Sequence, residues 1–256
     1  MNRNRMKETF FRRILFLVCG GVGLILLWMV VTEYKVWLEK SETFCIQKIE
    51  LHGLELLSET DIFQLCGLVP RSSIWEMNLE EISERIASNA FVEKVRVDRR
   101  LPDILRIRVE EKRPVALLNF QGNFFSVDRE GLVLPSKPGK LYDLPVLSGA
   151  FRGAVRVGGQ VTGRFVQQGL CFLILILEDR PELYNRISEI VVGRPEGLTL
   201  YTSRGGVPIW VGEGGYGWKI RYLEAILDEV VRGRELSQIR YIDLRFVGQI
   251  VVGMRA

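Results

Sequence analysis

The sequence predicts an α+β protein with one N-terminal transmembrane helix, a small module of β-α-α-β-β order, and then a β-rich domain with two helices. Three observations lead to this fold class. The apolar run of residues 14–31 contains no charged side chain. Helical and strand periodicities then alternate up to residue 112. After Pro114, short strand-like runs separated by glycine and proline dominate the sequence.

The N-terminal apolar run is long enough to cross a membrane, because a helix of that length spans roughly 27 Å, close to the hydrocarbon thickness of a bilayer. The tail before it is basic, so the positive-inside rule places residues 1–13 in the cytoplasm and everything after Thr32 outside it. A cleaved signal peptide is the alternative, since it shares the basic start and apolar core. The run exceeds a usual signal core and no A-x-A-like site follows, which favours an uncleaved anchor.

We therefore expect five parts along the chain. These are a cytoplasmic tail (1–13), a transmembrane helix (14–32), a linker (33–43), the small module (44–112) and the C-terminal β domain (113–256). The apolar run from Gly169 to Glu178 is too short to cross a bilayer and is expected to be a buried helix. The protein is thus expected to cross the membrane once.

The composition is typical of a folded globular protein and does not indicate a nucleic-acid partner. Apolar residues make up 47% of the sequence and charged residues 26%, and the formal net charge is only +4. The cysteines show no C-x-x-C spacing, so neither a zinc site nor a redox motif is expected. Cys45 and Cys66 could form a disulfide or remain buried free thiols, and both alternatives stay open.

The small module begins with a strand and two capped helices. "CIQKIELHG" alternates in strand fashion and stops at Gly53. Ser58 stands three residues before Asp61, which is an N-cap signal, and Gly67 ends that short helix. Asn78 caps a second helix, whose apolar stripe is Leu79, Ile82 and Ile86.

A hairpin closes the module. In "VRVDRRLPDILRIRVEE", Val95 and Val97 share one face, and Leu105, Ile107 and Val109 share one face, around a turn that holds Pro102. The opposite face carries charges of both signs, so cross-strand ion pairs are available. Because a nucleic-acid surface would need a one-sided basic stripe with aromatic residues, we expect a solvated sheet face instead.

The β domain contains strand-like runs interrupted by two helices, near residues 164–178 and 217–232. The runs are VALLNF, NFFSVD, GLVLP, AVRVGG, EIVVG, LTLYT and VPIWVG. "IRYIDLRF" and "QIVVGMR", on either side of Val247 and Gly248, predict a terminal hairpin. Asp243 and Arg245 share strand parity and are expected to pair with each other or with a neighbouring strand.

Residues 212–217 (GEGGYG) match the G-x-G-x-x-G pattern of dinucleotide sites, after a strand and before a helix. The context argues against a cofactor site, because only 39 residues remain after Gly217, and Trp218 stands where a phosphate-binding loop needs lysine. His52 is the single histidine and excludes H-E-x-x-H chemistry. No catalytic residue, cofactor or metal site is expected.

Four motifs, in this order, resemble the bacterial cell division family FtsQ/DivIB. "IQKIELHG" resembles the first strand of the family's POTRA module, and "FVEKVRVDRRLPDILRIRVEEKRPVA" resembles its closing hairpin. "SVDREGLVLP" resembles the element that follows, and "RYIDLRF" resembles the signature near the C-terminus. The resemblance covers nearly the whole chain, and it identifies residues 44–112 as the POTRA module.

The resemblance implies a non-enzymatic bitopic scaffold of the divisome, in the cytoplasmic (inner) membrane at the division septum. Such a scaffold binds coiled-coil division proteins of the FtsB/DivIC and FtsL kinds and helps couple septum assembly to the septal peptidoglycan synthase complex, with no nucleic acid or small-molecule substrate. In the family the partner is held by edge-strand pairing at the C-terminal end. Carried onto this chain, the partner-binding residues are Tyr241, Phe246, Val247, Gly248, Gln249, Ile250, Val251, Val252, Gly253, Met254 and Arg255.

Two alternatives remain. A POTRA-containing envelope assembly or secretion factor is disfavoured because no barrel-forming segment follows the module. A dinucleotide-binding envelope enzyme would depend on the glycine loop alone.

Overall fold

The computed structural model describes residues 20–37, 41–67, 72–136, 142–149, 153–195, 197–233 and 238–255. The chain divides into two compact units, Met1–Glu110 and Glu111–Ala256.

Among the described residues, one helix is long and apolar enough to cross a membrane, Gly20–Trp37. Its apolar side chains are exposed along the whole length, including Trp28 at 68%. The expected span begins at residue 14, so its first residues lie outside the described ones. The helix continues beyond Thr32, and the rings of Tyr34 and Trp37 stack with centroids 6.0 Å apart near its end. Aromatic rings at this position are typical of the membrane–water interface.

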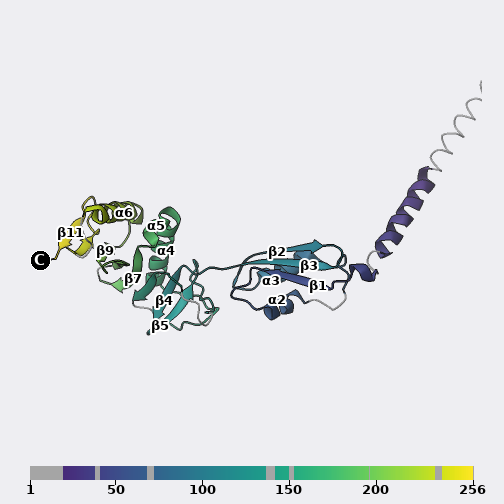
Figure 1. Ribbon diagram of the computed structural model, residues 1–256, viewed down its shortest axis with the longest axis horizontal. Coiled ribbons are helices and arrows are strands. Elements are labelled where there is room, and N and C mark those ends of the chain that lie inside the picture. The colour runs from purple at the N-terminus through teal and green to yellow at the C-terminus, as the bar shows by residue number, and fades with distance from the viewer. Residues whose placement is uncertain are drawn as a thin grey trace, which may run out of the picture. The chain divides into compact units, whose positions relative to one another are not determined.

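The rest of the first unit is a three-stranded sheet with two helices (Figure 1). β3 lies in the centre, between β1 and β2, and pairs in parallel with β1. The predicted β-α-α-β-β order is confirmed, with a short 3-10 helix before it. The elements are η1 (Glu42–Phe44), β1 (Lys48–His52), α2 (Glu59–Cys66), α3 (Leu79–Ala87), β2 (Val92–Arg100) and β3 (Ile104–Glu111).

Both helices begin at the caps that the sequence predicts. Ser58 and Asp61 form a capping box at α2, and Asn78 Oδ1 accepts hydrogen bonds from the first-turn N–H groups of Glu80 and Glu81 at α3. The caps fix where each helix begins, and the apolar faces of both helices pack on the sheet. The resulting core contains Ile62, Cys66, Ile82, Ile86, Val92, Leu105, Ile107 and Val109.

The second unit is built on one eight-stranded sheet of order β11-β10-β9-β8-β7-β6-β4-β5. The β4–β6, β6–β7 and β9–β10 pairs are parallel, and the remaining pairs are antiparallel. The strands are β4 (Ala116–Phe120), β5 (Asn123–Val127), β6 (Val146–Gly149), β7 (Ile187–Arg194), β8 (Gly197–Thr202), β9 (Pro208–Gly212), β10 (Ile239–Asp243) and β11 (Val251–Met254).

The helices of this unit, α4 (Arg164–Asp179), α5 (Pro181–Tyr184) and α6 (Tyr216–Gly233), lie along one side of the sheet (Figure 1). Alternate strand residues such as Leu147, Ile190 and Ile209 are buried in the same core as Phe172 of α4 and Leu223 of α6. The period-two pattern of the strands and the helical pattern of α4 and α6 therefore meet in one core.

Three features of this unit differ from the sequence prediction. The runs GLVLP and AVRVGG do not form strands; around the first, Val127–Val133 and Leu132–Gln160 make isolated bridges. Asp128 organises the loop there, since its Oδ1 accepts the N–H groups of Glu130 and Leu132. The short strand β6 and the one-turn helix α5 were not predicted, because four residues are too few for periodicity to show.

Gly53 lies very close to the backbone of β3 in the first sheet. It has φ +87°, and a Cβ built there would collide with the backbone carbonyl of Val109 in β3. Gly67 has φ +58°, but a Cβ there would meet only the end of the flexible Arg85 side chain. We expect Gly67→Ala to lower the free energy of unfolding by about 1 kcal/mol, the cost of left-handed backbone, and Gly53→Ala to lower it by more than about 2 kcal/mol.

Chemical denaturation of the fragment from residue 41 onward, followed by far-UV circular dichroism, measures both values. Equal destabilisation by the two alanines would contradict the close approach of Gly53 to β3.

Candidate partner-binding edge

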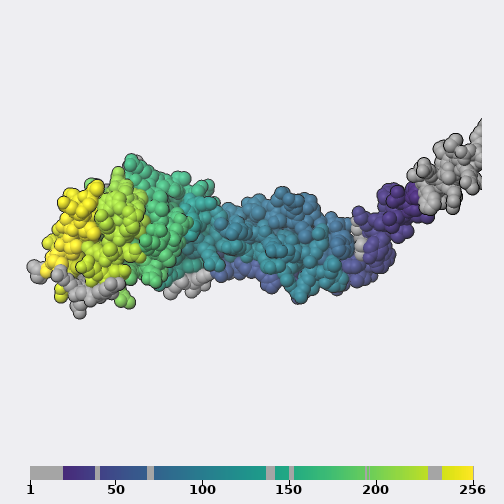
Figure 2. Space-filling view, turned by 90° about the horizontal axis from the view of Figure 1, so that it is seen from above, coloured from purple at the N-terminus to yellow at the C-terminus, as the bar shows by residue number. Residues whose placement is uncertain are grey.

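The predicted terminal hairpin is present and forms one edge of the eight-stranded sheet. β11 pairs with β10 on one side, and within the described parts of the chain no strand follows it on the other side. Figure 2 shows these C-terminal residues, in yellow, gathered at the surface at one end of their unit. Of the predicted partner-binding residues, Val251–Met254 form the edge strand, Tyr241 lies in β10, and Phe246 to Gly248 form the turn between them.

The hydrogen bonds around the hairpin show which backbone groups of β11 point outward. Arg255 donates its N–H to Gln238 O at 2.8 Å, toward β10. In an antiparallel pair the residues alternate between facing the partner strand and facing away. The backbone groups of Gly253 and Val251 therefore face β10, and the N–H and C=O groups of Val252 and Met254 face away from the sheet.

The neighbouring strand gives the same alternation independently. Leu244 donates its N–H to Trp210 O of β9 at 2.9 Å, so Ile242 also faces β9. Tyr241 and Asp243 then face β11, which agrees with their register positions opposite Gly253 and Val251.

The exposed side chains around this edge are mostly apolar or basic. Val251, Val252 and Met254 are 40%, 36% and 43% exposed, and Val247 in the turn is 86% exposed. Between residues 238 and 255 the only acidic residue is Asp243, which is buried. Arg240, Arg245 and Arg255 are exposed.

An aromatic stack on the face of the sheet opposite the helices supports the edge. The Arg245 guanidinium lies 5.0 Å from the centre of the Trp210 ring, and Trp210 stacks on Tyr241 with centroids 4.5 Å apart. The Tyr241 ring lies over Gly253, where any Cβ would collide with it. A ring covering a strand glycine replaces the packing that the glycine lacks, so this stack fixes β11 to β10 and β9.

Asp243 is held by Arg245, so the predicted local pair is confirmed. Its carboxylate accepts Arg245 Nε at 2.9 Å, Nη2 at 2.7 Å and the backbone N–H at 3.0 Å. These hydrogen bonds hold the pKa of the Asp243 carboxyl below its ordinary value, against the opposing effect of burial. The pair therefore orders the chain where it leaves β10 for the turn.

The glycine-rich turn 212–217 connects β9 to α6, and β10 follows α6 in parallel with β9. This local connection is the one that a dinucleotide motif requires. However, Lys219, only 3% exposed, donates from Nζ to Val211 O at 2.6 Å and to Glu213 O at 3.0 Å. Burial lowers the pKa of this ammonium. A phosphate site needs backbone N–H groups that point at the anion, whereas here backbone carbonyls point at the Lys219 ammonium. The turn therefore holds a buried lysine and packs α6 against β9.

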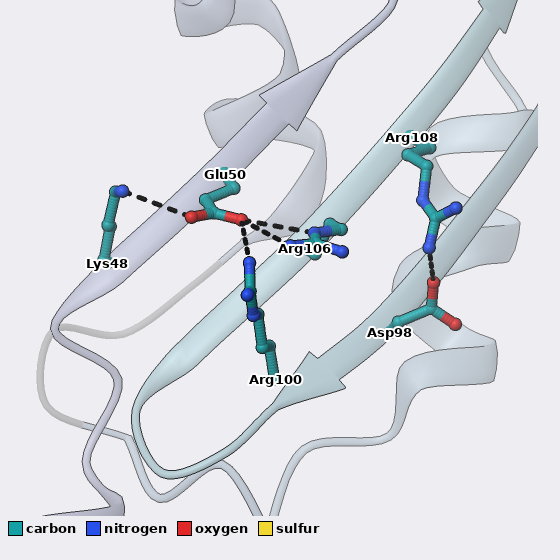
Figure 3. A network of polar contacts seen from close by, with 6 residues as sticks. All are labelled: Lys48, Glu50, Asp98, Arg100, Arg106 and Arg108. Carbon is teal, nitrogen blue, oxygen red and sulfur yellow. Dashed lines mark hydrogen bonds and ion pairs between the residues drawn. The ribbon is translucent and has the colours of Figure 1, made fainter.

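The charged face of the first sheet consists of ion pairs across its strands (Figure 3). Glu50 of β1 accepts Lys48 at 3.2 Å and Arg106 of β3 at 3.1 Å, and Arg100 of β2 lies at 3.7 Å. On the same face Arg108 pairs with Asp98 at 2.6 Å. The prediction of cross-strand pairs on a solvated face is confirmed.

These pairs shift the acid–base equilibria of the carboxylates. Hydrogen bonds from Lys48 and then Arg106 lower the pKa of Glu50, and a hydrogen bond from Arg96 is the main cause of the lowered pKa of Asp98. Both carboxylates thus keep their charge in mildly acidic solution.

Cys45, Cys66 and His52 show no sign of a shared reactive site. Cys45 and Cys66 are free thiols, and burial raises the pKa of Cys66 to about 11. His52 is exposed at the end of β1. Among the residues that the structure describes, no three histidine, cysteine, aspartate or glutamate side chains converge as a metal site would require.

Together, the helix, the β-α-α-β-β module and the β domain define a class of membrane-anchored proteins with a POTRA domain and a second β-rich domain. Comparison with known proteins specifies the family. Residues 44–112 match the family model "POTRA domain, FtsQ-type", and residues 116–245 match "Cell division protein FtsQ/DivIB, C-terminal".

Several curated relatives are similar over most of their length. A cell division protein FtsQ from Syntrophotalea carbinolica is 30% identical over 99% of this chain and 92% of its own. The FtsQ protein of Geotalea daltonii is 30% identical over 82% of this chain and 75% of its own, and that of Rhodothermus marinus 29% identical over 96% and 89%. The chain belongs to the FtsQ/DivIB family of cell division proteins, and its apolar N-terminal helix fits a single-pass membrane protein.

The contact between Tyr241 and Gly253 predicts mutual dependence. We expect Gly253→Val and Tyr241→Ala each to destabilise the C-terminal unit, the first by a steric clash and the second by uncovering the glycine. In the double variant the valine occupies the space that the ring vacates, so its loss of stability should be smaller than the sum of the single losses by about 0.5–3 kcal/mol. A double-mutant cycle of unfolding free energies measures this coupling, and strict additivity would contradict the packing.

The Glu50 pairs predict an acid-sensitive contribution to stability. Because the folded-state pKa of Glu50 is lowered, its stabilising effect is full above the ordinary value of 4.5 and disappears as the pH falls through the folded-state pKa. Glu50→Gln should therefore be less stable than the original chain at pH 7, with a difference that narrows on acidification. Urea unfolding midpoints of both chains between pH 7 and pH 3 test this, and a difference independent of pH would argue against the pairing.

Proposed function

We propose that this protein is a non-enzymatic bitopic scaffold of the divisome that captures a coiled-coil division protein on the open edge of β11. The proposal depends on one observation: the backbone N–H and C=O groups of Val252 and Met254 face away from the sheet. Unpaired edge groups are a template for an added strand, and chains that recognise partners by strand addition gain affinity from the new main-chain hydrogen bonds.

The side chains around the edge indicate which kind of partner strand would bind there. The exposed apolar side chains of Val251, Val252 and Met254 offer contacts on both faces of an added strand. Exposed Arg240 and Arg255 flank it, and Asp243, the one acidic residue between residues 238 and 255, is buried. A guest segment that alternates apolar residues and carries glutamate or aspartate at its ends would fit this edge.

The predicted site residues take different roles in this proposal. Val252 and Met254 supply the pairing groups, while Gln249, Ile250 and Val251 bring the chain into the edge strand. Tyr241 and Gly253 position the strand through the aromatic stack. Arg255 extends the edge, and the turn of Phe246, Val247 and Gly248 offers an exposed apolar surface beside it.

The cellular setting of the proposal comes from the tail and the family. Five basic residues precede the apolar helix against one acid, so the N-terminus stays in the cytoplasm and both folded units lie outside it. At the division septum the scaffold binds partners of the FtsB/DivIC and FtsL kinds and couples septum assembly to the septal peptidoglycan synthase complex.

A proline at one edge position tests strand capture. Val252→Pro removes an outward N–H and leaves the groups that face β10 in place. We expect it to weaken binding of the FtsB/DivIC-like protein of the same organism by about ten-fold or more, since a partner carbonyl loses its donor. Isothermal titration or pull-down with the purified partner measures the change.

Val252→Ala is the matched control, because it truncates the side chain and keeps the N–H, and it should lose much less affinity than Val252→Pro. Val251→Pro is less informative, since the Val251 N–H faces β10 and its loss would damage the edge itself. Unchanged binding by a folded Val252→Pro variant would show that the partner is held elsewhere.

A further inference from the structure

The end of the POTRA module at which the chain enters carries an exposed apolar surface that the partner-binding edge does not explain. Leu101, in the turn between β2 and β3, is 54% exposed, and Trp75 is 38% exposed. Phe44 packs edge-on against Trp75 with ring centroids 5.9 Å apart. We call this surface, formed by Phe44, Trp75 and Leu101, the apolar pole.

Backbone and side-chain hydrogen bonds hold the three residues of the apolar pole at one end of the module. Ile74 donates its N–H to Phe44 O at 2.8 Å, which joins the segment around Trp75 to η1. Arg99, two residues before Leu101, donates to Ile74 O at 2.7 Å and to Met77 O at 2.6 Å. The hairpin turn is also joined to the start of β1, because Gln47 donates to Asp103 O at 3.0 Å.

The covalent chain keeps this pole near the membrane. The apolar run ends at Val31, and the helix continues to Trp37, about 9 Å further along its axis, which is slightly more than the roughly 5–7.5 Å thickness of the headgroup layer. Glu42, the first residue of η1, follows Trp37 by five residues and lies at most about 18 Å from it, whatever path the chain takes. A tether this short gives the pole a high effective concentration at the bilayer surface.

From this we propose that the apolar pole docks on the bilayer surface next to the anchor, with Leu101 and Trp75 in the interfacial layer. Tryptophan and leucine suit this position, since one end of the indole is apolar and the other forms hydrogen bonds. The charges close to the pole are of both signs, Lys48 and Arg100 against Glu42 and Glu76. The contact therefore depends on apolar insertion more than on anionic lipid.

This docking requires the helix to be a membrane anchor and makes no use of the β11 edge, so it goes beyond the proposed function. Docking would also fix the orientation of the module. The start of β1 and the hairpin turn would face the lipid, and the opposite end of β2 would point away from the membrane.

Site-specific photocrosslinking in the full chain tests the proposal. The chain is reconstituted in nanodiscs of phosphatidylethanolamine and phosphatidylglycerol, with the benzophenone amino acid p-benzoyl-phenylalanine placed at Leu101, Trp75 or Lys94. Lys94 is exposed at the other end of β2, roughly 23 Å from Leu101 along the strand. We expect lipid adducts, detected by mass spectrometry, in severalfold higher yield at Leu101 and Trp75 than at Lys94.

A second variant separates docking from mere proximity. With the benzophenone at Trp75, Leu101→Asp should reduce the lipid-adduct yield severalfold, because the charge opposes insertion of the shared surface. Leu101→Met, which stays apolar, should leave the yield unchanged. Equal yields at all three positions, or a yield at Trp75 that Leu101→Asp does not change, would overturn the proposal. A circular dichroism spectrum shows that each variant is folded.

Discussion

The parallel pairing of β10 with β9 is the constraint on which the C-terminal end of the sheet depends. The helix that connects the two strands enforces it: the apolar face of α6 packs into the core through Ile220, Leu223 and Leu227, and Lys219 ties the preceding glycine turn to the end of β9. Among the described strands β11 pairs with β10 alone, so the position of the open edge depends on where this crossover places β10.

The two folded units expose different kinds of surface. The sheet of the POTRA module has a face of paired charges, in which Glu50 links three strands. Such exposed pairs add little stability each and keep the face soluble. The sheet of the second unit instead ends in an apolar edge with arginines beside it, supported by the stack of Trp210 and Tyr241. The apolar edge is therefore the better surface for binding a partner strand, whereas the face of paired charges is suited to contact with water.

Local signals and long-range packing differ in how well the sequence reports them. The caps at Ser58 and Asn78 and the alternation of Leu105, Ile107 and Val109 are properties of a few adjacent residues, and the structure confirms each. Runs such as AVRVGG have the composition of strands and yet form none. A strand requires a neighbour with free backbone groups, and no local pattern states whether one is present.

The sequence by itself determined the fold class, the apolar N-terminal helix, the terminal hairpin and the family, because periodicity, caps and ordered motifs are written in contiguous residues. Only the tertiary structure decided that β11 is the last strand of an eight-stranded sheet, that Val252 and Met254 face outward, and that Gly253 lies under Tyr241. The reason is physical: which strand is left unpaired, and which of its groups are free, depends on the pairing of segments far apart in the chain.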